Sequence, residues 1–304
     1  MRKLTHNLLD VIGNTPLVKV PFKTKAQIFA KLEYLNPGGS IKDRSALFMI
    51  EEAEKNGLLK PGGTIVESSS GNQGVACAMI GALKGYKVII TASPAMSEEK
   101  VKTIKAYGAK VIHCPSVPIH DPKSRHSQAI KLNKKIKNSF MPNQYFNLSN
   151  PKAHYSTLGP EIWRQTNGKI THYFGAAGTG GTVSGVGKFL KEKNPKIQII
   201  AVDVDTSFHS TNGKPKPYKM EGIGVDFDTH CLNESVIDEF FPVSDKNGLG
   251  MLPKMASKYG LLLGTGSGAV TYAVQNYLKK LKKNDVIVML FGDSGRAYPS
   301  KNYF

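Results

Sequence analysis

Short apolar segments alternate with longer amphipathic ones along almost the whole chain, and this alternation is the feature that most limits its fold. Residues 286–291 are apolar at every position, as in strands whose two faces are both buried. Residues 45–55 have helical spacing and stop before Gly57, a residue that favours the end of a helix. The alternation predicts an α/β fold in which mostly parallel, twisted sheets are flanked by helices.

The other segments continue this pattern. We expect strands over residues 28–33, 64–67, 87–91, 110–113, 171–174 and 197–203. We expect helices over residues 74–84, 124–137, 182–193, 246–259 and 269–280, and others that begin near Ser97 and at Asn150-Pro151. Ser97 is followed by Glu98 and Glu99, which is typical of a capped helix with acidic residues in its first turn. No low-complexity linker marks a domain boundary.

Three loops, each after an expected strand and before an expected helix, are rich in glycine and hydroxyl groups. They cover residues 36–44, 67–74 and 178–182. In open α/β sheets, ligands bind beyond the carboxyl ends of the strands. We therefore expect the functional site where these three loops meet.

The first loop has the sequence Asn-Pro-Gly-Gly-Ser-Ile-Lys-Asp-Arg and places Lys42 in the first turn of a helix. A cation is unfavourable there, so this position, together with partial burial, would lower the pKa of the amine. A neutral amine is what Schiff-base chemistry requires. The alternative for Lys42, taken by itself, is an ordinary surface lysine beside Asp43 and Arg44.

The second loop contains Ser68, Ser69, Ser70, Asn72 and Gln73 at the start of a helix. Serine hydroxyls and free backbone N–H groups at a helix N-terminus form a site for an anion such as a carboxylate. Helix capping would also use Ser and Asn, but this loop has more polar side chains than capping requires.

The third loop, Gly-Thr-Gly-Gly-Thr over residues 178–182, suits a single phosphate, because glycines let the backbone approach it and the threonines add donors. A dinucleotide-binding dehydrogenase is an alternative, since Asp203 ends the next strand at about the required distance. The third glycine of that fingerprint would fall at Val183, however, and the loop is short and rich in hydroxyl groups.

Together the loops offer an amine that can form an imine, a carboxylate site and a monophosphate site. Pyridoxal 5′-phosphate has one aldehyde and one phosphate, so it fits the first and third loops. The substrate would then be an amino acid whose carboxylate binds the second loop.

As a set, these motifs resemble the β-family (fold type II) of pyridoxal-phosphate enzymes, and within it the cysteine synthases and cystathionine β-synthases. The similarity runs from residues 12–17 to Asp293 and beyond, and it includes the Glu-Gly-Ile-Gly segment at residues 221–224. Residues 121–124 and the Asp226-Phe227 pair favour the cystathionine β-synthase side.

The resemblance implies a role for each matching residue. Lys42 would be the catalytic residue, forming the Schiff base with the cofactor and moving the α-proton. The cofactor would be held by Lys42, Asn72, Gly178, Thr179, Gly180, Gly181 and Thr182. The substrate would be bound by Ser69, Ser70, Asn72, Gln73, Gln144 and Gly222.

The resemblance also implies a tryptophan-synthase β-like fold of two α/β domains with the cofactor in the cleft between them. We expect one domain over residues 36–146 and the other over residues 1–35 plus 147–304, in a homodimer. The reaction would be β-replacement on serine or an O-activated serine by a thiol or sulfide. Serine with homocysteine is our first choice, and O-acetylserine with sulfide or a diamino-acid synthesis are alternatives. We expect neither a haem-binding extension nor a tandem regulatory domain.

The chain departs from the family pattern at two positions in the expected site. Gln73 stands where Thr is usual, so a longer amide would narrow the pocket or supply a new donor. Gly266 stands where a Ser or Thr usually faces the pyridine nitrogen. We predict that Ser267 supplies that hydroxyl by a shift of the glycine-flanked turn, with Thr265 as an alternative. Ser267 could instead only cap a helix that begins near Ala269.

Composition limits the other functional classes. The formal net charge is +18, from 41 Lys plus Arg and 23 Asp plus Glu, which favours an anionic partner. The lysines are scattered and not interleaved with aromatic residues, so we expect no nucleic-acid partner. We expect neither a membrane span nor a signal peptide. The three cysteines, Cys77, Cys114 and Cys231, have no metal-ligand spacing and indicate reduced thiols in a cytoplasm, with no metal site.

Overall fold

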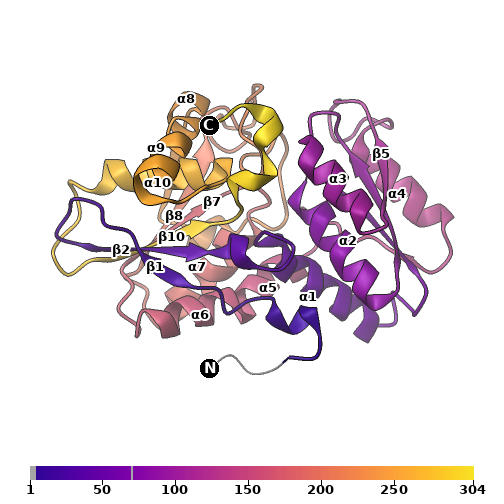
Figure 1. Cartoon of the computed structure of the whole chain (residues 1–304), viewed down its shortest axis with the longest axis horizontal. Helices are drawn as coiled ribbons and strands as arrows, with labels where there is room; N and C mark the ends of the chain where they lie inside the picture. The colour runs from indigo at the N-terminus through magenta and orange to yellow at the C-terminus, as the bar shows by residue number, and fades with distance from the viewer. Residues whose placement is uncertain (1–4, 70) are drawn as a thin grey trace.

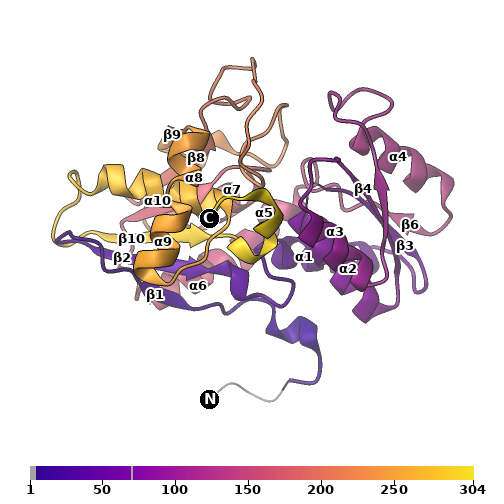
Figure 2. The ribbon, with the colours of Figure 1, turned by 45° about the horizontal axis from the view of Figure 1, so that its top comes forward.

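The computed structural model describes residues 5–69 and 71–304 and contains two open sheets, each flanked by helices (Figure 1). The α/β fold predicted from the alternating segments is therefore confirmed. Figure 2 shows the two groups of elements side by side after a rotation of 45°.

The larger sheet has six strands in the order β1-β2-β10-β7-β8-β9. Its strands are β1 (Leu17–Lys19), β2 (Gln27–Leu32), β7 (His172–Ala176), β8 (Gln198–Val204), β9 (Glu239–Val243) and β10 (Val286–Phe291). Only the edge strand β1 is antiparallel to its neighbour, and every other pair is parallel. The parallel pairs place the ends of β7, β8 and β10 at one edge of the sheet, where a ligand site is expected.

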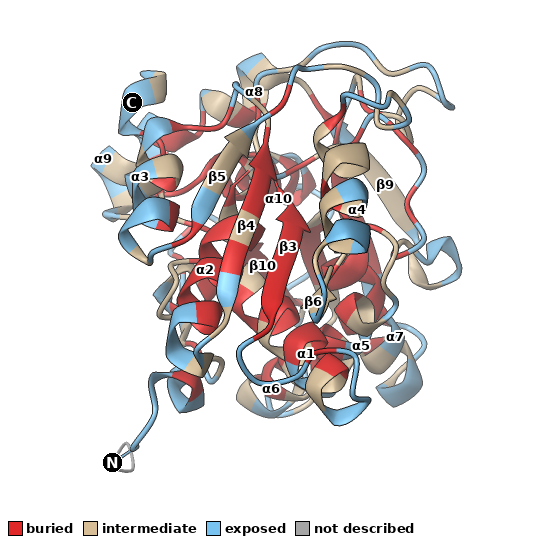
Figure 3. Ribbon diagram, turned by 90° about the vertical axis from the view of Figure 1, so that its right-hand side faces the viewer, coloured by how far each residue is buried: buried red, intermediate tan, exposed pale blue. Residues whose placement is uncertain are grey.

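The smaller sheet is entirely parallel, in the order β5-β4-β3-β6. Its strands are β3 (Thr64–Ser68), β4 (Lys87–Ala92), β5 (Lys110–His113) and β6 (Ser139–Phe140). The central strand β3 is buried along its whole length, as Figure 3 shows in red. All four strands come from one continuous stretch of chain. The domain limits at residues 36 and 146 stay a prediction.

The helices cover both faces of each sheet. They are α1 (Lys42–Lys55), α2 (Asn72–Lys84), α3 (Glu98–Ala106), α4 (Arg125–Lys135), α5 (Ser149–Ser156), α6 (Leu158–Gln165), α7 (Gly181–Lys193), α8 (Asp245–Leu249), α9 (Leu252–Tyr259) and α10 (Thr265–Tyr277). In the smaller sheet, α2 packs on β3 and β4 from one side and α4 packs on them from the other. In the larger sheet, α10 and α7 take these two places.

Strand β10 shows why the larger sheet forms. Its side chains alternate between two apolar clusters, with Ile287, Met289 and Phe291 on the α10 side and Val288 and Leu290 on the α7 side. Because both faces are covered, an all-apolar strand is favoured over an alternating one. The prediction of a strand at residues 286–291 is confirmed.

Two local predictions were wrong in detail. Residues 246–259 form two helices, α8 and α9, which are separated near Gly250. Ser97 precedes α3, but its hydroxyl does not cap the helix and donates instead to the carbonyl oxygen of Ala297 at 2.7 Å. A tertiary contact has therefore replaced the local capping bond.

Candidate active site

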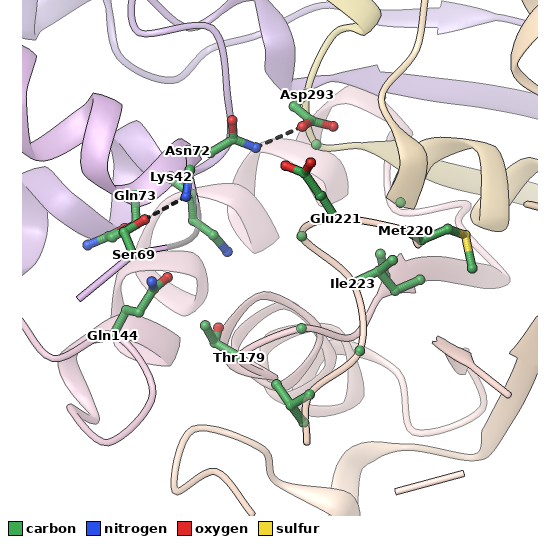
Figure 4. Close-up of a pocket in the computed structure, with 18 of the residues that line it drawn as sticks. Lys42, Ser69, Asn72, Gln73, Gln144, Thr179, Met220, Glu221, Ile223 and Asp293 are labelled. Carbon is green, nitrogen blue, oxygen red and sulfur yellow. Dashed lines mark hydrogen bonds between the residues drawn. The ribbon is translucent and has the colours of Figure 1, made fainter. Parts of the chain in front are cut away.

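A cavity of about 240 Å³ lies where the three glycine- and hydroxyl-rich loops meet (Figure 4). It is lined by residues from all three, by residues 218 and 220–227, and by the segment after β10. The loops follow β3 and β7 and precede α2 and α7, so the cavity lies at the carboxyl ends of parallel strands. The sequence-based expectation that these distant segments meet is confirmed.

Lys42 is the first residue of α1, and Figure 4 shows its side chain in the middle of the cavity. Burial lowers the pKa of its amine, while the negative charge of Asp293 opposes that effect. Its amine forms no ion pair among the residues that the structure describes. Burial therefore shifts this half-buried amine toward its neutral form, which is the reactive form in carbonyl chemistry.

The serine loop lies between β3 and α2. The Ser69 hydroxyl accepts hydrogen bonds from the backbone N–H groups of Gly71 and Gly74, each at 3.0 Å. Gln144 comes from the segment after β6, lines the same cavity, and donates to the carbonyl oxygen of Ser68 at 3.4 Å. Ser70 lies outside the described residues. Ser69 and Gln144 are thus brought together as the resemblance implies.

Gln73 lines the cavity, but its amide group has partners on the other side, inside the smaller sheet's core. Its nitrogen lies 3.7 Å from the Cys77 sulfur, and its oxygen lies 3.5 Å from the Ser45 hydroxyl. Burial raises the pKa of the nearby Glu67 carboxyl group to about 8. The longer amide of Gln73 therefore reaches Ser45 and Cys77 beneath the loop.

The glycine loop approaches a second loop too closely for side chains. A Cβ atom on Gly178 would lie 2.9 Å from the carbonyl oxygen of Gly222. Gly180 has φ +80°, a conformation that glycine adopts without strain. The Thr179 hydroxyl accepts from the Asn150 amide at 3.1 Å and from the Gly181 N–H at 3.2 Å, so this loop lies directly at the N-terminus of α7, an end of a helix that favours an anion.

Ser267 lies in the first turn of α10, which begins at Thr265 with Gly264 as the capping residue. The alternative in which Ser267 caps a helix starting near Ala269 is therefore wrong. Its side chain is 1% exposed and lines the cavity, and its hydroxyl has no hydrogen-bond partner among the described residues. The Thr265 hydroxyl, in contrast, donates to the carbonyl oxygen of Glu221.

Asn72 and Asp293 meet across the cavity, and the Asn72 amide donates to the Asp293 carboxylate at 2.7 Å (Figure 4). The Tyr298 hydroxyl also donates to Asp293. Lys100 and Glu221 form an ion pair at 2.9 Å beside them. These contacts join α2 to the segment that follows β10, and α3 to the loop that contains Glu221.

The cavity is also lined by residues that were not assigned to the site from the sequence, among them Lys100, Arg125, Tyr145 and Asp293. Asp293 had a usable signal, because it follows the carboxyl end of an expected strand. Arg125 had one too, since a cation in the first turn of a helix is unfavourable and needs a reason. Lys100 and Tyr145 carried no local signal.

Comparison with known proteins gives a family for this site. The family model described as pyridoxal-phosphate dependent enzyme matches residues 8–293. The chain belongs to this family. The resemblance inferred from the loops is confirmed, and so is the prediction that the cofactor of this enzyme is pyridoxal phosphate.

Several relatives of this pyridoxal-phosphate enzyme have names. A cystathionine beta-synthase of Apis mellifera is 43% identical over 98% of the chain, and a cysteine synthase of Staphylococcus aureus (strain N315) is 40% identical over 98%. The chain spans 61% of the length of the first and 97% of the second.

Solved structures agree on the fold of this pyridoxal-phosphate enzyme. The O-acetylserine dependent cystathionine beta-synthase from Helicobacter pylori has a TM-score of 0.93 and 34% identity, with 100% of both chains covered. An O-ureido-L-serine synthase also has a TM-score of 0.93, at 32% identity, with 99% of this chain and 96% of that chain covered.

The residues present fit the cofactor of the family. An added Cβ atom would lie 2.9 Å from the Gly222 carbonyl oxygen at Gly178 and 2.6 Å from the Leu232 side chain at Gly180, so this loop has room only for glycine there, and the start of α7 offers N–H groups to a phosphate. The buried hydroxyl of Ser267 needs an acceptor or donor that the described protein does not supply. The Lys42 amine forms no ion pair among the described residues.

Residues 5–69 and 71–304 contain neither a candidate membrane span nor a candidate metal cluster. Every helix there is too short or too polar to cross a bilayer. Within the same residues, no cluster of three or more His, Cys, Asp or Glu side chains has the arrangement of a metal site.

Proposed function

We propose that this enzyme catalyses β-replacement on serine or an O-activated serine with a thiol nucleophile, and that homocysteine is the thiol and cystathionine the product. The observation that carries the proposal is the free, half-buried Lys42 amine at the junction of the carboxylate and phosphate loops. Two further facts support it: relatives are named cystathionine beta-synthase, and a similar structure is an O-acetylserine dependent enzyme of that name.

In this proposal each loop binds a different chemical group. Gly178, Thr179, Gly180, Gly181 and Thr182 hold the cofactor phosphate, Asn72 lies beside the ring, and Ser267 donates to or accepts from the pyridine nitrogen. When bound, pyridoxal phosphate supplies an aldehyde carbon for the substrate amine and a ring that spreads negative charge. Ser69, Gln144 and the N-terminus of α2 orient the substrate carboxylate, with Gln73 and Gly222 at the border of that site.

Lys42 then has two tasks at its Nζ atom. It would hold the cofactor, and as a free amine it would remove the α-proton of the substrate. A hydroxide leaving group must be protonated in order to depart, whereas acetate departs readily. The same Lys42 amine would return the proton to a serine hydroxyl. The loops that surround Lys42 would exclude water while the thiol enters.

The choice between substrates is tested by one matrix of assays. Purified enzyme is given serine or O-acetylserine, each with homocysteine, with sulfide or with an amine, and turnover is compared. We expect homocysteine to be the preferred nucleophile. Activity only with O-acetylserine and sulfide would contradict the proposal and support a cysteine synthase. Activity only with an amine nucleophile would support a diamino-acid synthase.

The role of Lys42 has its own test. Borohydride reduction should attach the cofactor to Lys42, and Lys42→Ala should remove both the visible absorbance and turnover. Lys102→Ala is the control, because Lys102 is an exposed lysine on α3. A colourless wild-type protein that takes up no pyridoxal phosphate would contradict the assignment. A homodimer, a cytoplasmic location and the division at residues 36 and 146 are further proposals that rest on the resemblance.

A further inference from the structure

One part of the cavity differs in chemistry from the part that the three loops build. It is lined by Arg125 at the start of α4, by Tyr145, and by Tyr218, Asp226 and Phe227 from the loop after β8. None of these residues belongs to the carboxylate or phosphate loops. This aromatic and charged wall is therefore left for a second reactant.

Three cations line the cavity among the described residues: Lys42, Lys100 and Arg125. Lys42 is assigned to the cofactor. Lys100 is already paired with Glu221 at 2.9 Å and lies 3.8 Å above the Tyr298 ring. Arg125 forms no ion pair in the described part of the chain, not even with Asp226 on the same cavity.

The position of Arg125 is fixed by its backbone. Its carbonyl oxygen accepts a hydrogen bond from the Thr91 hydroxyl at 2.7 Å, and Ser124 caps the helix through the Ser127 N–H at 3.1 Å. Burial raises the pKa of Tyr218 on the loop after β8, and the charge of Arg125 opposes that rise. The guanidinium thus acts across the cleft from a rigid helix end.

We propose that Arg125 binds the carboxylate of the incoming thiol and so makes the enzyme select an amino-acid thiol over sulfide. A guanidinium presents two parallel N–H groups that match the two oxygens of a carboxylate. A half-buried arginine without a partner has lost part of its hydration, and a carboxylate restores those hydrogen bonds. Sulfide has no group that can use this residue. The inference rests on the proposed function, because it concerns the second substrate of that reaction.

The test compares two thiols that differ by one carboxylate. Homocysteine and 3-mercaptopropylamine share the thiol, the carbon chain and the amine. With O-acetylserine or serine as first substrate, Arg125→Gln should raise the KM for homocysteine by about tenfold or more, because a charge-assisted hydrogen-bond pair is lost. The KM for 3-mercaptopropylamine should change little. Arg125→Lys should keep part of the preference for homocysteine over 3-mercaptopropylamine. Lys123→Gln is the matched control, because Lys123 is an exposed neighbour of Arg125.

The outcomes separate this inference from the proposed function. If wild-type enzyme uses homocysteine and Arg125→Gln affects both thiols equally or neither, the assignment of Arg125 is wrong and the function stands. An increase in KM for the first substrate instead of the thiol also overturns it. If homocysteine is not used but cysteine is preferred over cysteamine, and Arg125→Gln removes that preference, the function is wrong and the assignment stands. Use of sulfide alone contradicts both.

Discussion

At the scale of single residues, the most informative atom is the hydroxyl oxygen of Ser267. It is buried against the cavity and has no hydrogen-bond partner among the described residues. A buried, unsatisfied hydroxyl is a cost of about 1–3 kcal/mol that a protein usually avoids. The nearby Thr265 hydroxyl already donates a hydrogen bond to the carbonyl oxygen of Glu221. This contrast supports the proposal that Ser267 supplies the hydroxyl for the cofactor ring.

Ser267→Ala should therefore separate two roles. Without cofactor, the variant should be at least as stable as wild type in urea, because no protein hydrogen bond is lost. With cofactor, kcat should fall about fivefold and the visible spectrum should shift, because one hydrogen bond of about 1 kcal/mol is removed from the ring. Loss of about 1 kcal/mol of stability without cofactor, with an unchanged spectrum, would mean that Ser267 only supports the helix.

Glu67 gives a prediction about pH. Burial raises its pKa from 4.5 to about 8, so between these values the folded chain keeps a proton that the unfolded chain has released. This stabilisation is complete below about pH 4.5 and is lost as the pH rises through about 8. Relative to Glu67→Gln, which cannot titrate, wild type should lose up to about 1.4 kcal/mol of unfolding free energy per pH unit between pH 5 and 8.

Urea titrations of both proteins at several pH values measure this difference. Glu98→Gln on the exposed surface is the control and should follow wild type at every pH. Parallel curves for wild type and Glu67→Gln would show that Glu67 is ionised in the folded protein over this range.

Local pattern was enough to predict that the three loops meet, because each carries its glycine and hydroxyl groups in consecutive residues. The role of Lys42 came from the resemblance and stays a prediction. Local pattern gave only weak signals for Arg125 and Asp293, because the cavity that they line is built from distant parts of the chain. The role of Ser267 at the pyridine nitrogen stays a prediction, but its alternative as a cap failed because α10 begins at Thr265, four residues before Ala269. The amide of Gln73 also turned toward Cys77, a contact that only packing determines.

At the scale of elements, a buried ionic cluster ties four segments together. Arg44 on α1 pairs with Glu33 and with Glu161 on α6, each at 2.7 Å, and Lys31 on β2 pairs with Glu161 at 2.8 Å. Burial alone would raise the pKa of Glu161, but the hydrogen bonds and charge of Arg44 lower it to about 2. The cluster fixes the N-terminal strand and α1 against the larger sheet's outer helices.

Glu161→Gln should destabilise the protein strongly, because the buried cations Lys31 and Arg44 would lose the negative charge that they share. Removing one partner of a buried pair costs about 3–5 kcal/mol. The exposed Glu98–Lys102 pair on α3 is the matched control, and Glu98→Gln should change stability by no more than about 0.5 kcal/mol. Chemical denaturation measures both. Equal losses for the two variants would mean that the buried cluster contributes no more than a surface pair.

Elements were predicted well where burial on both faces imposes a pattern, as for residues 286–291. The short edge strands β1, β6 and β9 were missed, since their residues are partly exposed and carry no clear alternation. The helix predicted over residues 246–259 broke near Gly250, where an added Cβ atom would lie 2.8 Å from the Lys246 carbonyl oxygen. Its periodicity continues across the break, so spacing alone could not locate it.

At the scale of the whole molecule, polar contacts fasten α3 to the segment after β10 and to the loop that contains Glu221. Lys100 pairs with Glu221, Ser97 donates to the Ala297 carbonyl at 2.7 Å, and the Ser300 N–H donates to Glu99 at 2.8 Å. Lys100 is only 4% exposed. These contacts are few and polar, so they can open and close as substrates enter.

Lys100→Met should weaken the polar contacts that hold α3 closed over the cavity. We expect faster amide hydrogen exchange in residues 97–106 and a KM for the amino-acid substrate about fivefold higher, because one charged contact across the cleft is lost. Lys102→Met, on the same helix but exposed, should change neither quantity. Slower turnover with unchanged exchange would show that Lys100 acts on the substrate directly and not through closure.

The pairing of β2 with β10 sets an order of events during synthesis. The smaller sheet can assemble as soon as residues 64–140 have left the ribosome, since all its strands are then present. Strand β2 is made before them but must wait for the last strand of the chain before its inner edge is covered. During that interval an apolar strand edge stays open to other molecules, and such edges promote misassembly. Nascent chains of this protein should therefore depend most on chaperones in the last stage of translation.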